Sequence, residues 1–361
     1  MSRQWISTAV ASLILAAPFA ARGQTIDEFV VPTANAKPQC IVPGPDGNLW
    51  FTEGGARKIG KITPDGQITE YAVHSNSGGL SLDVQCLTTG PDGDIWFTTS
   101  ALLHRGPLTE PRGKIGKMTT TGVVTVYPHE FEAELYAITP GPDGALWFTE
   151  TTLFNENTIG RITTSGDFTE YPLPDPGALI AASGIVAGPD GRIWFTQAGA
   201  QEIGTITTDG ETITSYPTPG FLPAGITVGP DGALWFTEGG TAIGLAQITT
   251  DGDVTQYDIP SVPANVVTGP DGALWLTEGN KIARWIKTGR NPEITELAVP
   301  TPGSAPDGIA SGPDGNIWFT ERTGNKVGRV NLIPPATCGT GRGHVRPVAP
   351  PEILTCVSQR P

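Results

Sequence analysis

The stretch Gly44-Pro45-Asp46-Gly47-Asn48-Leu49-Trp50-Phe51-Thr52-Glu53 decides the fold, because close copies of it recur along the chain. The other copies begin at Gly90, Gly141, Gly188, Gly229, Gly269 and Gly312. Most of the tryptophans occupy one position of these copies: Trp50, Trp96, Trp147, Trp194, Trp235, Trp275 and Trp318. A block repeated at this period is typical of proteins built by stacking one supersecondary unit.

Each repeat has the pattern of four short strands. In the first repeat we expect strands over residues 39–43, 48–53, 58–63 and 68–73. Asp-Gly turns join the first pair and the last pair, which is a strong hairpin signal because glycine adopts positive φ without steric strain. A unit of four strands, repeated along the chain with seven copies of the first block, predicts an all-β, seven-bladed β-propeller.

The two ends of the repeat region complement each other. The seventh repeat ends near Val330 without a fourth strand, whereas the segment 25–32 resembles the fourth strand of the first repeat at 68–73. We therefore expect the N-terminal segment to pair with the last blade as its outer strand, which leaves that blade without an open edge.

Three regions follow from this pattern. Residues 1–23 have a basic start, an apolar run without charge and small residues before Gln24, as in a secretory signal peptide, with an uncleaved membrane anchor as the alternative. Residues 25–332 form the propeller, and residues 333–361 form a proline-rich tail. The predicted location is secreted or periplasmic, where disulfides are allowed.

Four cysteines leave the disulfide pairing open. A bridge between Cys338 and Cys356 would close the tail. Cys40 and Cys86 occupy equivalent positions in the innermost strands of neighbouring blades, and are either a second bridge or two small buried thiols.

The charge excludes some partners. The chain has 22 Lys and Arg residues against 36 Asp and Glu residues, for a formal net charge of −14. Nucleic acid and anionic membrane surfaces both need a basic patch, so we expect neither as a partner. A monomer with a small-molecule or peptide ligand at its loop-rich end is the prediction.

The variable connections of the blades point to one end of the molecule. The Asp-Gly turns are uniform and lie at one end, so the longer loops at 73–83, 100–113 and 128–135 lie at the other, where function usually resides. They contain His74, His104 and His129, which either form a binding or acid–base site or are simply solvated. We take His104 and His129 as candidate substrate-binding residues.

A ring of acidic residues is expected at the same end. The second strand of five blades ends in glutamate: Glu53, Glu150, Glu238, Glu278 and Glu321. Carboxylate oxygens suit hard cations such as Mg²⁺, and Glu321 and Glu278 are the candidate ligands. The alternative is that each glutamate caps local backbone donors.

The innermost strands predict the mouth of a central channel. Its residues are Gln39, Gln85, Tyr136, Ser183, Ala224, Ala264 and Asp307. Asp307 is acidic, and with Glu321 it would form a carboxylate pair for metal binding or acid–base work. Asp307 is alternatively an ordinary turn residue. Tyr136 is a candidate substrate-binding residue.

The repeats resemble the virginiamycin B lyase (streptogramin lyase) family, through the sequence at 141–150 and 229–238 and through Ile159-Gly160-Arg161-Ile162-Thr163. The resemblance implies opening of a cyclic depsipeptide by β-elimination at its ester, assisted by Mg²⁺ and a histidine base. The stretch that corresponds to the family's Glu-Pro-His-Gly-Ile is Ala305-Pro306-Asp307-Gly308-Ile309 here, so Asp307 stands at the base and Glu321 keeps the metal-binding acid. Ala264 occupies the position at which the family pattern has a histidine that contacts the substrate.

Three functions remain open from the sequence. The first is a metal-assisted carbon–oxygen lyase, with Asp307 in place of the histidine base. The second is a non-catalytic propeller that binds a ligand or protein through its variable loops. The third is a metal-dependent hydrolase similar to gluconolactonases, which also use acidic metal sites in propellers.

Overall fold

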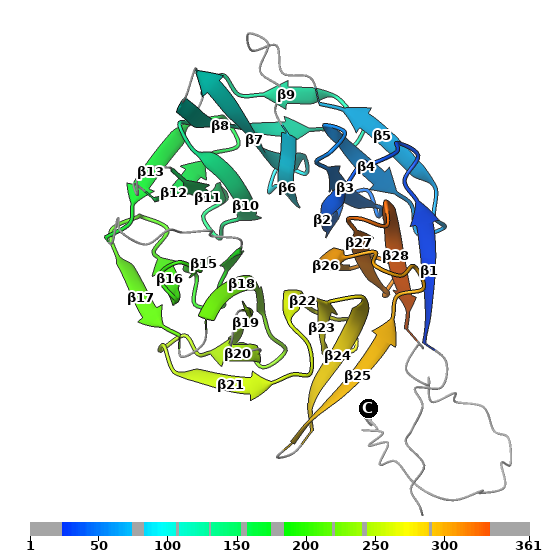
Figure 1. Cartoon of the computed structure of the whole chain (residues 1–361). Coiled ribbons are helices and arrows are strands. Elements are labelled where there is room, and N and C mark those ends of the chain that lie inside the picture. The colour runs from blue at the N-terminus through cyan, green and yellow to red at the C-terminus, as the bar shows by residue number, and fades with distance from the viewer. Residues whose placement is uncertain are drawn as a thin grey trace, which may run out of the picture.

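The computed structural model describes residues 24–73, 83–105, 108–129, 131–152, 157–174, 184–218, 221–239, 244–288 and 291–332. These residues form seven four-stranded antiparallel sheets arranged in a ring around a central axis (Figure 1). The prediction of an all-β, seven-bladed propeller is therefore confirmed. No helix among the described residues is long and apolar enough to cross a membrane.

Blades 1 to 3 follow the repeats from the inside of the ring outwards. Blade 1 contains β2 (Pro38–Pro43), β3 (Leu49–Glu53), β4 (Lys58–Ile62) and β5 (Ile68–Ala72). Blade 2 contains β6 (Asp83–Thr89), β7 (Ile95–Arg105), β8 (Leu108–Met118) and β9 (Val124–Val126). Blade 3 contains β10 (Glu134–Pro140), β11 (Leu146–Thr151), β12 (Thr158–Ile162) and β13 (Phe168–Pro172).

Blades 4 to 7 complete the ring. Blade 4 contains β14 (Ile185–Ala187), β15 (Ile193–Gln197), β16 (Glu202–Ile206) and β17 (Ile213–Pro217). Blade 5 contains β18 (Phe221–Val228), β19 (Leu234–Gly239), β20 (Gly244–Ile248) and β21 (Val254–Asp258). Blade 6 contains β22 (Pro263–Thr268), β23 (Leu274–Glu278), β24 (Lys281–Thr288) and β25 (Asn291–Ala298). Blade 7 contains β26 (Pro306–Ser311), β27 (Ile317–Glu321), β28 (Lys326–Asn331) and β1 (Thr25–Val30).

The first turn of each repeat explains the repeated Gly-Pro-Asp-Gly-x-x-Trp spacing. The indole Nε1 of Trp50 donates to the Asp46 carboxylate at 3.1 Å, and Gly47 takes a φ of 75° to close the turn. The same aspartate–tryptophan bond occurs in all seven blades, with distances of 2.9 to 3.1 Å. The turn thus supplies a partner for a buried indole that would otherwise be unsatisfied.

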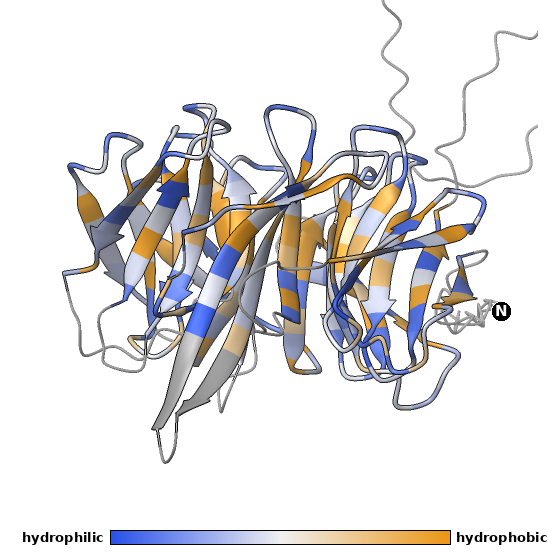
Figure 2. Cartoon of the chain, turned by 90° about the horizontal axis from the view of Figure 1, so that it is seen from above, coloured by the Kyte–Doolittle hydropathy of each residue, from blue (hydrophilic) through white to orange (hydrophobic). Residues whose placement is uncertain are grey.

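Both faces of the second strand are buried between neighbouring blades. Leu49 and Phe51 pack on one side with Trp318 of blade 7, whereas Trp50 packs on the other side with Leu87 of blade 2. This accounts for the consecutive apolar residues of the repeat, because each face of a blade is covered by the next blade. Figure 2 shows the ring from the side, with hydrophobic residues concentrated in the strands and hydrophilic residues in the loops.

The threonine of the second strand donates to a carbonyl of the next blade in at least five blades, from Thr52, Thr98, Thr237, Thr277 and Thr320. Thr52 Oγ1 accepts a hydrogen bond from the Cys40 amide of its own blade at 3.1 Å and donates to the Gln85 carbonyl of the next blade at 3.1 Å. This satisfies backbone groups at a β-bulge between Pro38 and Ile41, where the ladder between β2 and β3 is interrupted.

The N-terminal strand closes the ring as predicted. β1 pairs antiparallel with β28, from Thr25 opposite Asn331 to Val30 opposite Lys326. In Figure 1 the blue β1 lies beside the orange β28 at the outer edge of blade 7. The closure covers the edge of β28 that would otherwise be open.

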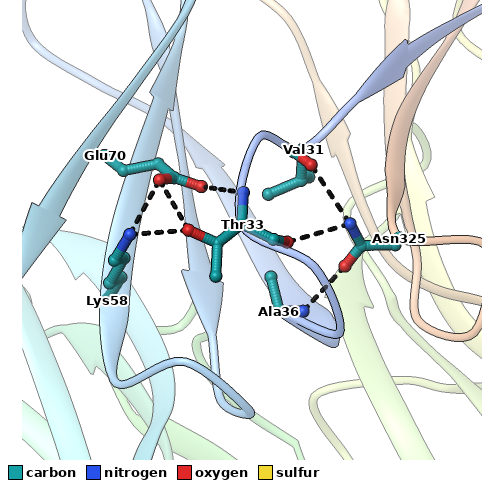
Figure 3. A network of polar contacts seen from close by, with 6 residues as sticks. All are labelled: Val31, Thr33, Ala36, Lys58, Glu70 and Asn325. Carbon is teal, nitrogen blue, oxygen red and sulfur yellow. Dashed lines mark hydrogen bonds and ion pairs between the residues drawn. The ribbon is translucent and has the colours of Figure 1, made fainter.

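A set of polar contacts, the closure clasp, holds the chain that leads from β1 into blade 1 (Figure 3). Asn325 Nδ2 donates to the carbonyls of Val31 and Thr33 at 3.1 and 3.0 Å, and its Oδ1 accepts from the Ala36 amide at 2.7 Å. On the other side, Glu70 accepts from the Thr33 amide and hydroxyl, both at 2.8 Å. The clasp therefore ties the last blade to the first.

One expectation about the connections is wrong. The segment 100–113, expected as a loop, belongs largely to an extension of β7 and β8, which pair from Ser100 opposite Gly113 to Arg105 opposite Leu108. The physical reason is backbone pairing: β7 and β8 continue their antiparallel ladder past the end of the other strands of the blade, up to the pair of Arg105 and Leu108. The predicted signal peptide at 1–23 and the tail at 333–361 lie outside the described residues.

Candidate functional site

The central channel opens at the end of the molecule where the inner strands begin. Bulges interrupt the pairing between Pro306 and Ile309 in blade 7, and at the equivalent places in blades 1, 2 and 3. The bulged residues lie at the mouth of the channel, among them Asp307. Bulges often re-aim side chains next to functional sites.

The channel contains a cavity of about 650 Å³. The inner strands contribute one apolar residue from each blade to its lining: Ile41, Leu87, Ile138, Ile185, Ile226, Val266 and Ile309. Most of these side chains pack between the blades, and Ile226 and Ile309 are the partly exposed ones. Polar groups gather at the mouth: Gln39, Gln85, Tyr136, Asn265, Asp307 and Arg322. A cavity of this size, with apolar and polar groups in its lining, lies in the range of small-molecule sites.

Asp307 is held between two neighbouring blades. The side-chain amide of Asn265 donates to its carboxylate at 3.3 Å and to its backbone carbonyl at 3.2 Å. The next residue, Gly308, has to be a glycine, because a Cβ there would lie 2.1 Å from the Gln39 carbonyl oxygen of blade 1. Burial raises the pKa of Asp307, and the positive charge of Arg322 partly offsets this. Asp307 thus has the properties of a proton acceptor that works above the usual range of an aspartate.

Arg322 is the functional residue that the sequence analysis missed. It follows Glu321 at the end of β27, is exposed and lines the cavity. The residues at the equivalent position of the other blades are small and uncharged: Gly54, Ser100, Thr151, Ala198, Gly239 and Gly279. A comparison of the repeats position by position would have found it as the departure from that pattern.

Two predicted substrate-binding residues line the same mouth. Tyr136 lies in the bulge of β10, and its hydroxyl donates to the carboxylate of Glu134. Burial raises the pKa of the Tyr136 hydroxyl, so this group remains a proton donor at neutral pH. Ala264 also lines the cavity, and its small side chain leaves room in blade 6.

The two predicted metal ligands point elsewhere. Glu321 and Glu278 are fully buried and do not line the cavity. The carboxylate of Glu321 lies near Glu28 and Lys326 of the outer strands, and Glu278 lies near Glu296 and Lys281. Burial, with the neighbouring carboxylate adding to it, raises the pKa of each to about 7. The structure therefore does not bring them together with Asp307.

The side chains present do not fit the Mg²⁺ that the resemblance implies. Within the described ranges, no group of three or more His, Cys, Asp or Glu side chains is placed to hold a metal ion. Asp307 faces the channel and Glu321 faces the outer strands of its own blade. A magnesium ion at these residues stays a prediction, and we derive no chemical step through it.

His129, the histidine whose side chain the structure describes, does not line the central cavity. His129 stacks on Phe168 and meets the edge of Phe131 in blade 3, with Nε2 at 3.8 Å from Glu170. The backbone of His104 lies in the extended part of β7, and its side chain lies outside the described part of the structure. His74 and His344 also lie outside the described residues.

Cys40 and Cys86 form a disulfide, which joins the inner strands of blades 1 and 2. This is one of the two alternatives that the sequence left open, and it agrees with an oxidising compartment. The bridge lies beside Gln39 and Gln85 in the wall of the cavity. The pair Cys338 and Cys356 lies outside the described residues.

The ring, the closure by β1 and the central cavity define a seven-bladed propeller with a cavity on its axis. The sequence model of the virginiamycin B lyase family matches residues 17–109, 83–261 and 180–333. The chain belongs to this family. No curated protein matches it.

Solved structures agree with this assignment. A structure described as streptogramin B lyase is 34% identical, with a TM-score of 0.72, and the match covers 86% of this chain and 98% of the other. Virginiamycin B lyase from Staphylococcus aureus is 35% identical, with a TM-score of 0.72 and coverage of 86% and 100%. A catalytically inactive histidine-to-alanine variant of that enzyme with quinupristin is 36% identical, with the same TM-score and coverage.

Proposed function

We propose that the chain is a carbon–oxygen lyase that opens a small cyclic ester in its central pocket, with Asp307 as the base. The observation that carries this proposal is a largely desolvated carboxylate with a raised pKa at the mouth of the central cavity. Membership of the family and the quinupristin complex of a relative support a cyclic depsipeptide as the substrate class.

The chemistry needs a base and a position for the leaving group. The Asp307 carboxylate takes the proton from the carbon next to a carbonyl, and the electrons of that C–H bond form a C=C bond. The C–O bond of the ester at the adjacent carbon breaks, and its electron pair leaves with the carboxylate oxygen. No water is consumed, because the ring opens by elimination. The apolar groups in the lining of the cavity supply contacts that hold the substrate.

The first test uses quinupristin as the probe. We expect the wild-type chain to convert it to a ring-opened product of unchanged mass, and Asp307→Asn to lower the rate by at least about a hundredfold, because the amide cannot accept the proton. The measurement is liquid chromatography with mass spectrometry. Asp251→Asn, an exposed turn residue, is the matched control and should keep the wild-type rate.

Each other outcome selects another function. A product heavier by one water indicates a hydrolase of the gluconolactonase type. Binding of quinupristin without any product, in wild type and Asp307→Asn alike, indicates a non-catalytic binding propeller. That second function has an observation in its favour, since Ala264 and Ala305 stand where the family pattern has a histidine and a glutamate.

We also propose that the protein is secreted or periplasmic and acts as a monomer. The Cys40–Cys86 disulfide supports an oxidising compartment. The pairing of β1 with β28 supports a monomer, because blade 7 obtains its fourth strand from the same chain and needs no strand from a second copy.

A further inference from the structure

The mouth of the cavity contains one cation that the proposed elimination has not yet used. Among the described residues that line the cavity, Arg322 is the basic one and Asp307 the acidic one, and the others are apolar, small or neutral polar. The Arg322 side chain is exposed at the mouth, while its backbone amide donates to the Ala305 carbonyl at 3.1 Å. The guanidinium is therefore open to a ligand that enters the pocket.

Neighbouring groups orient this guanidinium. With the Gln39 amide turned so that its oxygen faces Arg322, that oxygen accepts from Nη2 at 3.0 Å and from Nε at 3.3 Å. Gln39 comes from blade 1 and Arg322 from blade 7, so the contact spans the closure of the ring. A guanidinium has five N–H donors, and donors remain for a ligand after the contact with Gln39.

The charge of Arg322 is only partly compensated. Within the described part of the chain no carboxylate lies within 4.0 Å of its guanidinium, and the Asp307 carboxylate at the same mouth accepts instead from the Asn265 amide at 3.3 Å. An arginine fork matches the planar geometry of a carboxylate with two parallel hydrogen bonds. Val42, Ile226 and Ile309 line the same cavity and are partly exposed, so they offer contacts to an apolar body.

We infer that Arg322 makes the mouth of the central cavity a carboxylate-binding position, and that the cavity takes an amphipathic carboxylic acid with its apolar part on the axis. In the elimination proposed above, which this second step assumes, the ester oxygen that accepts the electron pair becomes such a carboxylate. Arg322 then binds the leaving carboxylate and stabilises its developing negative charge. The binding of a free carboxylate does not depend on catalysis.

The test compares two small probes that differ in charge. N-acetylleucine carries a carboxylate, and N-acetylleucinamide carries a neutral amide on the same apolar body. We expect the wild-type chain to bind the acid at least about tenfold more tightly than the amide, as an arginine–carboxylate pair predicts. Isothermal titration calorimetry measures both. Arg322→Gln should remove this preference, whereas Arg322→Lys should keep part of it.

A matched variant controls for loss of positive charge. Arg192→Gln removes an arginine that pairs with Asp190 in the turn of blade 4 and does not line the cavity. It should bind both probes as the wild type does. Equal affinity of the wild type for acid and amide, or an unchanged preference in a folded Arg322→Gln variant, would overturn the inference.

The outcomes separate this inference from the proposed function. A carboxylate preference that depends on Arg322, without any conversion of quinupristin, supports the binding position and rejects the lyase. If conversion of quinupristin requires Asp307 but is unaffected by Arg322→Gln, the result supports the lyase function and rejects the role of Arg322.

Discussion

Residues at one position of the repeats make the same contacts in every blade, so a residue that differs from its counterparts is a candidate for function. The bond between the aspartate of the turn and the tryptophan of the second strand recurs in every blade, as between Asp46 and Trp50. Such residues need no functional explanation. Asp307 and Arg322 differ in charge from their counterparts in the other blades and face one cavity. They are therefore the strongest functional candidates at the scale of single residues.

The pKa of Asp307 leads to a prediction for the pH dependence of activity. The base must be ionised to accept a proton, so the rate should rise with pH through the pKa of Asp307. Because burial raises that pKa above 3.8, the acidic limb of the profile should lie at higher pH than for an ordinary aspartate. Arg322→Gln removes the charge that opposes this shift, and should move the limb to still higher pH.

The measurement is kcat/KM for quinupristin against pH, which reports the free enzyme. The exposed-residue variant Asp251→Asn should reproduce the wild-type profile. An acidic limb that is the same in wild type and Arg322→Gln would contradict the electrostatic contact between Arg322 and Asp307.

At the scale of the strand, the buried glutamates show what the end of the second strand does. Glu53, Glu278 and Glu321 are fully buried, and neither carboxylate oxygen of any of them has a hydrogen-bond partner that satisfies normal geometry. In blade 4 the position is Gln197, whose Nε2 donates to Ser215 at 3.0 Å. A neutral side chain therefore fits this place, which agrees with a glutamate that keeps its proton.

These carboxyls predict that stability falls as the pH rises. Burial raises the pKa of Glu53 from 4.5 to about 8, with the nearby Glu70 adding to the effect. The folded state then holds a proton that the unfolded state loses above about pH 4, so the free energy of unfolding decreases between the two pKa values. The slope is at most about 1.4 kcal/mol per pH unit for one carboxyl.

Glu53→Gln replaces the titrating carboxyl by a neutral amide. It should reduce the fall in the free energy of unfolding between pH 5 and pH 8, without lowering that free energy at pH 8. Urea denaturation at both pH values measures the change. Glu211→Gln, at an exposed turn of blade 4, is the control and should leave the slope as in the wild type. If Glu53→Gln had the wild-type slope, Glu53 would not be protonated in the folded protein.

At the scale of the whole molecule, the ring depends on one non-covalent joint. Strand β1 precedes blade 1 in the sequence but belongs to the sheet of blade 7, which it joins through its pairing with β28, side-chain contacts such as Glu28 with Thr301 and Phe29 with Trp318, and the closure clasp. An equivalent clasp within continuous chain occurs one blade earlier, where Asn280 binds the Val299 carbonyl and the Ser304 amide.

Loss of the clasp should destabilise the ring. Asn325 has a φ of 54°, so Asn325→Gly keeps the backbone conformation while it removes three hydrogen bonds. We expect a loss of about 2–3 kcal/mol in the free energy of unfolding. Asn280→Ala is the control, and should cost less because its blade cannot detach from the ring. An equal loss in both variants would mean that the closure is no weaker than the other joints.

Much of the candidate site could be predicted from the repeats, and the remainder could not. The mouth residues Gln39, Tyr136 and Asp307 were predicted, because residues at one position of every repeat must form a ring. The orientation of Glu321 was not, since a residue at the end of a strand can face the axis or the outer strands. Its side chain lies near Lys326 and Glu28, and Glu28 comes from the far end of the chain.

The amino-acid sequence alone determined the number of blades, their strand order and the closure by the N-terminal segment. Repetition, turn chemistry and the missing last strand are local features, and they need no knowledge of distant contacts. Only the tertiary structure decided which charged groups share the cavity. Gln39, Asn265, Asp307 and Arg322 come from three blades, and the curvature of the closed ring brings them to one mouth. The packing between blades also keeps the glutamates away from that mouth. Glu53, Glu278 and Glu321 lie at the ends of second strands, which are buried between neighbouring blades.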